Sequence, residues 1–236
     1  MAEQHNLCEC RCSVYQQRGA AACRGCGDVM NRGRIRKAND NIGQVPDMQA
    51  VENACAALLK ALAIDWERDP NTKETPKRMA KMYVLEVMRG RYEPRPEIKE
   101  FPNQNGLDQL YVVGPIRINS MCSHHMVPIV GQAWLGILPS KEGKVLGLSK
   151  FARLADWIFR RPQIQEEATI QLADEIEALT EAQGIAVAVK AQHLCMSWRG
   201  VNDPNAMMTT SVTRGLLREK AAARAEFFEM IKGSGF

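Results

Sequence analysis

The sequence predicts an α+β fold with an antiparallel sheet, on the evidence of its composition and the order of its patterned segments. Its 236 residues are 45% hydrophobic and 25% charged, which suits one globular domain with an extension. Helical and strand patterns follow in the order helices, strand pair, helix pair, strand pair, helix, without repeats or low-complexity segments. Separate runs of strands and helices in this order are typical of an α+β architecture.

The chain divides near residue 45. Residues 1–45 are polar, are rich in Cys, Arg, Gly and Asn, and show no sustained helical or strand period. We expect an irregular or metal-bound Cys-rich extension there, and a regular folded domain over residues 46–236.

The folded part begins with an N-terminal helical segment. Asp47 is a candidate N-cap for a first helix. Its apolar residues fall on one face, which we expect to be buried: Val51, Ala54, Leu58 and Leu62. A second helix is predicted to start at Thr75-Pro76 and to end at Gly90.

The remaining elements alternate between strand and helix patterns. In chain order they are strands over 109–118 and 127–138, helices over 149–159 and 164–183, a strand over 185–198 and a helix over about 218–232. The longer helix has a buried apolar stripe, and Gly184 ends it.

Charge and hydropathy exclude several functional classes. The 31 basic and 27 acidic residues give a net charge of +4, which is too mild for a nucleic-acid binder. No apolar run approaches the ~20 residues of a membrane span, and the N-terminus lacks the form of a signal peptide. We therefore expect a cytoplasmic protein without nucleic-acid or membrane partners.

The histidines and cysteines of the folded part form two groups. Cys122-Ser-His124-His125 is the first, and His193-Leu-Cys195 is the second. This spacing is typical of zinc ligands, and on a predicted strand the period of two puts His193 and Cys195 on one face. Cys122, His125 and Cys195 can serve as three zinc ligands with an open position, which leaves His124 and His193 for proton transfer.

Two simpler interpretations compete with a catalytic zinc. The residues could be ordinary buried cysteines and loop histidines, although two such groups in one domain make this less favourable. Alternatively, a histidine could fill the fourth position of a structural zinc site, which the spacing alone leaves open.

Several cations and one acidic pair favour an anionic, purine-like ligand. Lys150 and Arg153 share a helical face near a helix start, and Arg199 follows Cys195 closely. Such cations near a metal suit a polyphosphate, although each could be a solvated surface charge. Glu166, which follows Gln165 at the next helix start, is either a simple helix-terminal charge or a buried carboxylate that binds a guanine-like edge.

Four motifs together resemble GTP cyclohydrolase I: Cys-Ser-His-His-Met-Val-Pro (122–128), Gly-Leu-Ser-Lys-Phe-Ala-Arg (147–153), Arg-Arg-Pro-Gln-Ile-Gln-Glu (160–166) and His-Leu-Cys-Met-Ser-Trp-Arg-Gly (193–200). The helix at 75–83 is also similar to this family, and the resemblance covers roughly residues 47–232. It implies a tunnelling fold, with helices on one face of an antiparallel sheet and subunits packed sheet edge to sheet edge. It also implies a toroidal homodecamer with active sites between subunits.

The resemblance further implies a reaction and a role for each matched residue. GTP and water would give formate and 7,8-dihydroneopterin triphosphate, at a site with one zinc ion per subunit. The implied zinc ligands are Cys122, His125 and Cys195, and the implied catalytic residues are His124, His193 and Ser149. The implied substrate-binding residues are Glu166 for guanine with Gln165 beside it, and Lys150, Arg153, Arg199 and Lys81 for the triphosphate. The role of Lys81 rests on the resemblance only.

Two positions depart from the family pattern. The family usually has Glu where this chain has Ser123, and often has Arg where it has Glu167. Neither is a predicted ligand, so the departures bear on rate and substrate more than on the metal.

The extension precedes the resemblance and carries five cysteines: Cys8, Cys10, Cys12, Cys23 and Cys26. They either form a second, structural zinc knuckle or belong to a thiol-rich tail.

Alternative functions are a related tunnelling-fold enzyme acting on another purine or pterin, and a zinc-stabilised binding module. The product could enter folate or biopterin synthesis, or 7-deazaguanine synthesis.

Overall fold

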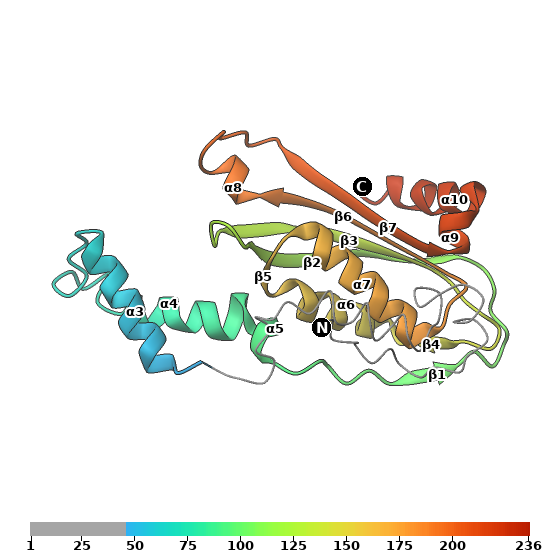
Figure 1. Ribbon diagram of the computed structural model, residues 1–236, viewed down its shortest axis with the longest axis horizontal. Coiled ribbons are helices and arrows are strands. Elements are labelled where there is room, and N and C mark those ends of the chain that lie inside the picture. Colours follow the sequence, from blue (N-terminus) through green and yellow to red (C-terminus); the bar gives the residue numbers. More distant parts are fainter. Residues whose placement is uncertain (1–45) are drawn as a thin grey trace, which may run out of the picture. The chain divides into compact units, whose positions relative to one another are not determined.

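A computed structural model describes residues 46–236 of the chain, and these residues form an α+β fold around one five-stranded sheet (Figure 1). The sheet has the order β5-β2-β3-β6-β7. Its strands are β2 (Tyr111–Cys122), β3 (Pro128–Leu138), β5 (Pro162–Gln163), β6 (Gly184–His193) and β7 (Met207–Gly215). All neighbours are antiparallel except β2 and β5, which confirms the predicted fold class.

Helices cover the sheet unequally on its two faces. The main core lies between one face and the helices α6 (Leu148–Phe159) and α7 (Gln165–Thr180), which run across it in Figure 1. Side chains alternate along β3, so that Leu135 enters this core while Trp134 points to the opposite face. There α9 (Leu216–Glu219) and α10 (Ala221–Lys232) form a second, smaller cluster with it.

Both edges of the sheet lack a partner strand over most of their length among the described residues. On one side β5 pairs only with Met121 and Cys122, so the rest of β2 is an edge. Pro115 lies in this stretch, and proline is tolerated there because an edge strand loses no ladder hydrogen bond. The opposite edge is β7.

The N-terminal helical segment differs from its prediction at the buried face. Helix α3 (Met48–Ala61) begins at the predicted cap, where the Asp47 carboxylate accepts a hydrogen bond from the Gln49 amide. However, Leu58 and Leu62 are 49% and 60% exposed, and Cys55 and Leu59 are buried instead. Helix α3 packs mainly against α4 (Thr75–Lys81). The rest of its apolar surface is therefore left uncovered by the described residues of a single chain.

The second predicted helix does not end at Gly90. It continues from α4 into a π-helical segment, η2 (Met82–Val87), and then α5 (Arg89–Tyr92). Gly90 is buried inside α5, and a Cβ atom there would lie 2.0 Å from the carbonyl oxygen of Trp157. The glycine is therefore required for close contact with α6, and the prediction of a C-terminal stop is wrong.

The strand predicted over 185–198 is also too long. Strand β6 ends at His193, and the short helix α8 (Leu194–Ser197) follows immediately. Cys195 therefore lies on a helical turn, and the period-two argument for its direction does not apply.

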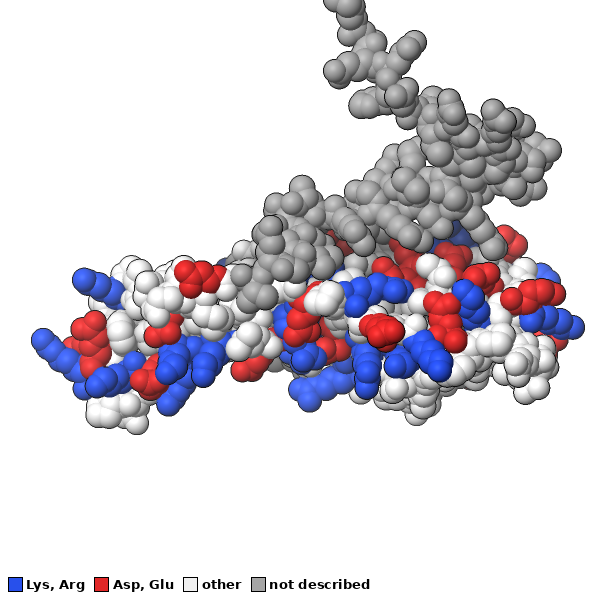
Figure 2. Space-filling view, turned by 90° about the horizontal axis from the view of Figure 1, so that it is seen from below, with Lys and Arg blue, Asp and Glu red and all other residues white. Residues whose placement is uncertain are grey.

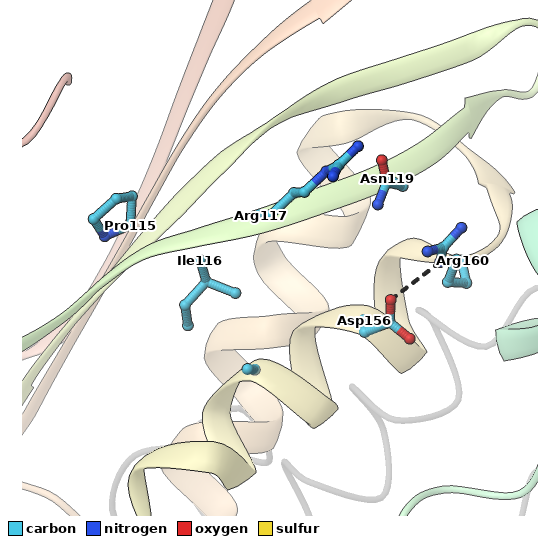
Figure 3. Close-up of a pocket in the computed structure, with 7 residues that line it drawn as sticks. Pro115, Ile116, Arg117, Asn119, Asp156 and Arg160 are labelled. Atoms are coloured by element: carbon cyan, nitrogen blue, oxygen red, sulfur yellow. Dashed lines mark hydrogen bonds and ion pairs between the residues drawn. The ribbon is translucent and has the colours of Figure 1, made fainter.

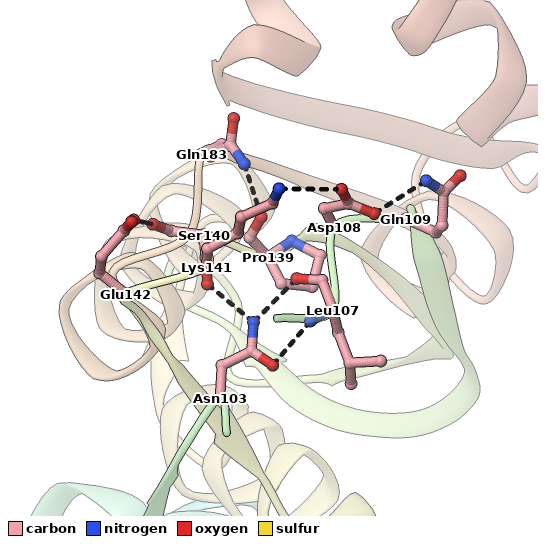
Figure 4. A network of polar contacts seen from close by, with 9 residues as sticks. All are labelled: Asn103, Leu107, Asp108, Gln109, Pro139, Ser140, Lys141, Glu142 and Gln183. Carbon is pink, nitrogen blue, oxygen red and sulfur yellow. Dashed lines mark hydrogen bonds and ion pairs between the residues drawn. The ribbon is translucent and has the colours of Figure 1, made fainter. Parts of the chain in front are cut away.

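A loop network ties β1 (Glu100–Pro102) and β4 (Lys144–Leu146), which form a separate two-stranded sheet, to the main sheet. The Asn103 amide nitrogen donates to the carbonyl oxygens of Leu107 and Ser140, and its oxygen accepts from the Leu107 amide (Figure 4). All polar atoms of this buried side chain are thus paired, which holds the loop before α6 in place.

The five cysteines predicted to form a knuckle, Cys8, Cys10, Cys12, Cys23 and Cys26, lie outside the described residues. Within residues 46–236, none of the helices combines the length and the apolar character that crossing a bilayer requires.

Candidate metal centre and active site

The fold brings the three predicted zinc ligands together at one end of the sheet. Cys122 is the last residue of β2, His125 lies in the turn to β3, and Cys195 lies on α8. One ligand atom from each residue lies within 4.8 Å of the others, and within residues 46–236 no other group of His, Cys, Asp and Glu side chains is arranged in this way.

A tight turn holds the histidines beside Cys122. The Cys122 amide donates to the Val127 carbonyl oxygen at 2.9 Å, and the Met126 amide donates back to the Cys122 oxygen at 2.9 Å. Met126 has a φ of 55°, in the left-handed region, as the tight reversal requires. The Nδ1 atoms of His124 and His125 each lie 4.0 Å from the Cys122 Sγ.

The donor set fits a zinc ion. In a tetrahedral zinc site, Zn–S and Zn–N bonds of about 2.3 and 2.0 Å separate the ligand atoms by roughly 3.5–3.8 Å. The observed 4.8 Å limit requires only a small contraction. Burial and the hydrogen bond with Cys122 raise the pKa of the Cys195 thiol. Such a thiol becomes a good ligand once a metal displaces its proton.

His193 is next to the cluster but is not a member of it. It ends β6 opposite Ile129, so the strand ladder sets its position. Its Nε2 atom lies 2.8 Å from Oε1 of Gln165, the first residue of α7. Burial lowers the pKa of His193, while the charge of Glu166 acts in the opposite direction and is the smaller effect.

Two charged residues border this end of the sheet. The Arg199 Nη1 atom lies 3.0 Å from the His125 Nε2 atom, which places a cation beside the cluster. Glu166 is exposed in the single chain, whereas the guanine-binding interpretation required a buried carboxylate.

The structure does not bring Ser149, Lys150 and Arg153 to this end. They lie in the first turns of α6, whose C-terminal end leads through β5 to Cys122. With a rise of about 1.5 Å per residue, Lys150 lies ~14 Å along the helix from its last residue. Lys81 is on another element again, at the exposed end of α4. Within one chain, the predicted phosphate-binding residues of α6 and α4 are therefore on different elements from the predicted zinc ligands.

The arginines of the third motif have structural partners. Arg160 forms an ion pair with Asp156 at 3.0 Å, and Arg89 pairs with the same carboxylate. Arg161 is 3% exposed, and its guanidinium carbon lies 4.2 Å from the ring centroid of Trp157. Both arginine side chains therefore interact with neighbouring side chains of the same chain.

An open pocket of about 510 Å³ lies elsewhere, between the edge of β2 and helix α6 (Figure 3). Its lining includes Arg117, Asn119, Asp156 and Arg160 but none of the predicted site residues. The uncovered part of the face in Figure 2 carries both acidic and basic side chains.

Sequence patterns missed two residues near His193. Thr169 of α7 and Thr210 of β7 contact each other and Gln165. No motif marks them, since they meet only because α7 packs across β6 and β7.

The family model that matches this chain and its relatives by sequence name the same family. The model of the GTP cyclohydrolase I family matches residues 51–232. A GTP cyclohydrolase 1 from Corynebacterium glutamicum (strain R) is 43% identical over 185 residues, covering 77% of this chain and 94% of the relative. The enzyme of the same name from Streptomyces avermitilis is 42% identical over 180 residues, covering 76% and 88%. One from Coxiella burnetii (strain Dugway 5J108-111) is 38% identical over 186 residues, covering 77% and 100%.

Proposed function

The chain belongs to the GTP cyclohydrolase I family, and from this premise we propose that it is a zinc-dependent GTP cyclohydrolase I. The reaction converts GTP and water into formate and 7,8-dihydroneopterin triphosphate. The observation that carries the proposal is the group of Cys122, His125 and Cys195, with His193 beside it and outside the ligand set.

The metal chemistry follows from the three-residue donor set. A zinc ion held by Cys122, His125 and Cys195 would act as a Lewis acid and activate water at its open position. Among the described residues, three protein side chains offer donor atoms to one metal ion. Three protein ligands with an open position are typical of catalytic zinc sites, whereas structural zinc sites have four.

The proton transfers fall to the histidines that are not ligands. His193 is half-buried and its lowered pKa favours the neutral form at pH 7, so it can exchange a proton with a purine nitrogen. His124 is exposed on the turn beside the cluster, where it can assist a later step such as ribose opening. Arg199 lies at the same border and can bind a phosphate group of the substrate.

The rest of the substrate site is completed by other copies of the chain. Ser149, Lys150 and Arg153 lie in the first turns of α6, away from the end of the helix that leads to Cys122, and we assign them to the site of a neighbouring copy. The unpaired edges of β2 and β7 and the exposed apolar residues of α3 leave surface for such contacts. We therefore propose a homo-oligomer, a decamer by family resemblance, with Lys81 and the α6 cations binding the triphosphate and Glu166 binding guanine.

The proposed product places the enzyme at the start of a pterin and folate pathway or a 7-deazaguanine pathway, in the cytoplasm. The decisive test is incubation of zinc-loaded protein with GTP, while formate release and the pterin chromophore are followed together. Stoichiometric appearance of both supports the proposal. Unchanged GTP in the presence of confirmed bound zinc would refute it.

A further inference from the structure

Gln165 makes more contacts than a substrate-binding side chain needs. It is 2% exposed, and its amide nitrogen lies 3.0 Å from Thr210 Oγ1, 3.2 Å from the Met208 oxygen and 3.4 Å from the Val189 oxygen. Its amide oxygen lies 2.8 Å from His193 Nε2. Both ends of the amide are therefore engaged within the protein.

These contacts determine which way the amide faces. Backbone carbonyl oxygens only accept hydrogen bonds, so the end of Gln165 near Met208 and Val189 must be the NH2 group. The oxygen then faces His193 and can only accept. His193 must consequently carry a hydrogen on Nε2, which leaves Nδ1 as the nitrogen with the lone pair when the ring is neutral.

Two threonine hydroxyls complete the arrangement. Thr169 Oγ1 donates to the Gln165 main-chain oxygen at 2.7 Å, so its hydrogen is not available to Thr210. In the 2.9 Å contact between the two hydroxyls, Thr210 must therefore be the donor. With its hydrogen committed to Thr169, the Thr210 oxygen accepts from the Gln165 amide. The donor and the acceptor of every hydrogen bond between Thr169, Thr210 and Gln165 are thus determined.

We propose that Thr210 and Thr169 are positioning residues which, by orienting Gln165, hold His193 in its Nε2–H tautomer and leave Nδ1 to exchange protons with the substrate. Gln165 is then a positioning residue rather than a direct substrate ligand. This proposal deepens the assignment of His193 as a catalytic residue and rests on the proposed function.

The first test replaces Thr210 by Val, which keeps the shape and removes the hydroxyl, with Thr210→Ser as the matched control. Without the hydroxyl, the Gln165 amide nitrogen loses its shortest contact, at 3.0 Å, and keeps only the longer ones to the Met208 and Val189 oxygens, so the amide holds His193 less firmly. We expect kcat to fall about 10- to 100-fold in Thr210→Val, with KM for GTP within about twofold, because an interaction that acts in the transition state is lost. Thr210→Ser should stay within about threefold of the unchanged protein.

A mutant cycle tests whether Thr210 acts through Gln165. In a Gln165→Ala background, Thr210→Val should reduce kcat by less than about twofold further, since the intermediary is already absent. Zinc content and melting temperature, measured for every variant, show whether each has kept its fold and metal. Independent, multiplying effects of the two substitutions, or an unchanged kcat in Thr210→Val, would overturn the proposal.

A readout without turnover separates this proposal from the proposed function. The sequence has four histidines, so the ¹⁵N spectrum of histidine-labelled, zinc-loaded protein is simple, and a His193→Gln variant assigns the signal. We expect the Nε2–H tautomer in the unchanged protein and a detectable fraction of the Nδ1–H tautomer in Thr210→Val, where only the two longer contacts still orient the amide. An Nδ1–H tautomer in the unchanged protein would refute the inference. Absence of GTP turnover with the expected tautomer would instead refute the proposed function alone.

Discussion

The two ends of the sheet differ in how much of the candidate site one chain supplies. At the end formed by Cys122, His125 and Cys195, segments far apart in sequence meet through strand pairing, and His193 is held by Gln165. Ser149, Lys150 and Arg153 lie instead in the first turns of α6, and Lys150 is about 14 Å along that helix from the end that leads to Cys122. This difference underlies our proposal that one chain builds the chemical half of its own site, while its phosphate-binding residues serve the site of another copy.

The largest expected effect on activity concerns His193, beside the cluster of Cys122, His125 and Cys195. His193→Ala should lower kcat about 10²- to 10⁴-fold, as expected for loss of a general acid or base. Zinc content should stay near one ion per cluster, because His193 lies outside the ligand set. Elemental analysis alongside the GTP assay checks both. Loss of the zinc would mean that His193 is a ligand and that the division of roles is wrong.

The next effect concerns the α6 end. Arg153→Ala should raise KM for GTP about 10- to 100-fold, because a hydrogen bond to a charged group contributes ~1.5–3 kcal/mol. Its kcat should change less. Arg160→Ala on the same helix is the matched control, since that side chain pairs with Asp156. An equal rise of KM in both variants would argue against a specific role for Arg153.

Mixed oligomers test directly whether the two halves of a site come from two different copies of the chain. His193→Ala chains and Lys150→Ala/Arg153→Ala chains should each be nearly inactive at low GTP. If a site takes one half from each of two neighbouring copies, random co-assembly restores about a quarter of the sites. Co-expression with two different tags and purification through both provides the sample. No recovery in a verified mixed oligomer would mean that both halves come from the same chain.

The smallest effect is expected at Ser123, which lies between Cys122 and the two histidines and where the family usually has Glu. Ser123→Glu adds a negative charge next to the cluster without touching a predicted ligand. We expect kcat to change by less than about tenfold, that is by under ~1.4 kcal/mol, with unchanged zinc content. Steady-state kinetics checks this. A larger change would make Ser123 part of the proton-transfer path.

The fold class and the grouping of Cys122 with His125 could be predicted from the sequence because both depend on local patterns, whereas Cys195 lies far along the chain and its predicted strand is a helical turn. Strand alternation and the spacing within 122–125 are visible in one segment. The errors come from contacts between segments. Gly90 is needed for contact with Trp157, and Leu58 and Leu62 remain exposed because a single chain leaves that face of α3 uncovered. The contact of Gln165 with Thr210, which is 45 residues away, left no pattern in the sequence.

The two open edges of the sheet have a consequence for the life of a newly made chain. Within residues 46–236, the outer side of β7 has no partner strand along a run of Met, Thr, Ser and Val, and much of β2 has none either. Such edges readily pair with any extended strand, including those of unrelated or incompletely folded chains. An isolated subunit of the proposed oligomer is therefore prone to aggregation, and its yield in a cell should depend on chaperones and on synthesis rate as well as on its own stability.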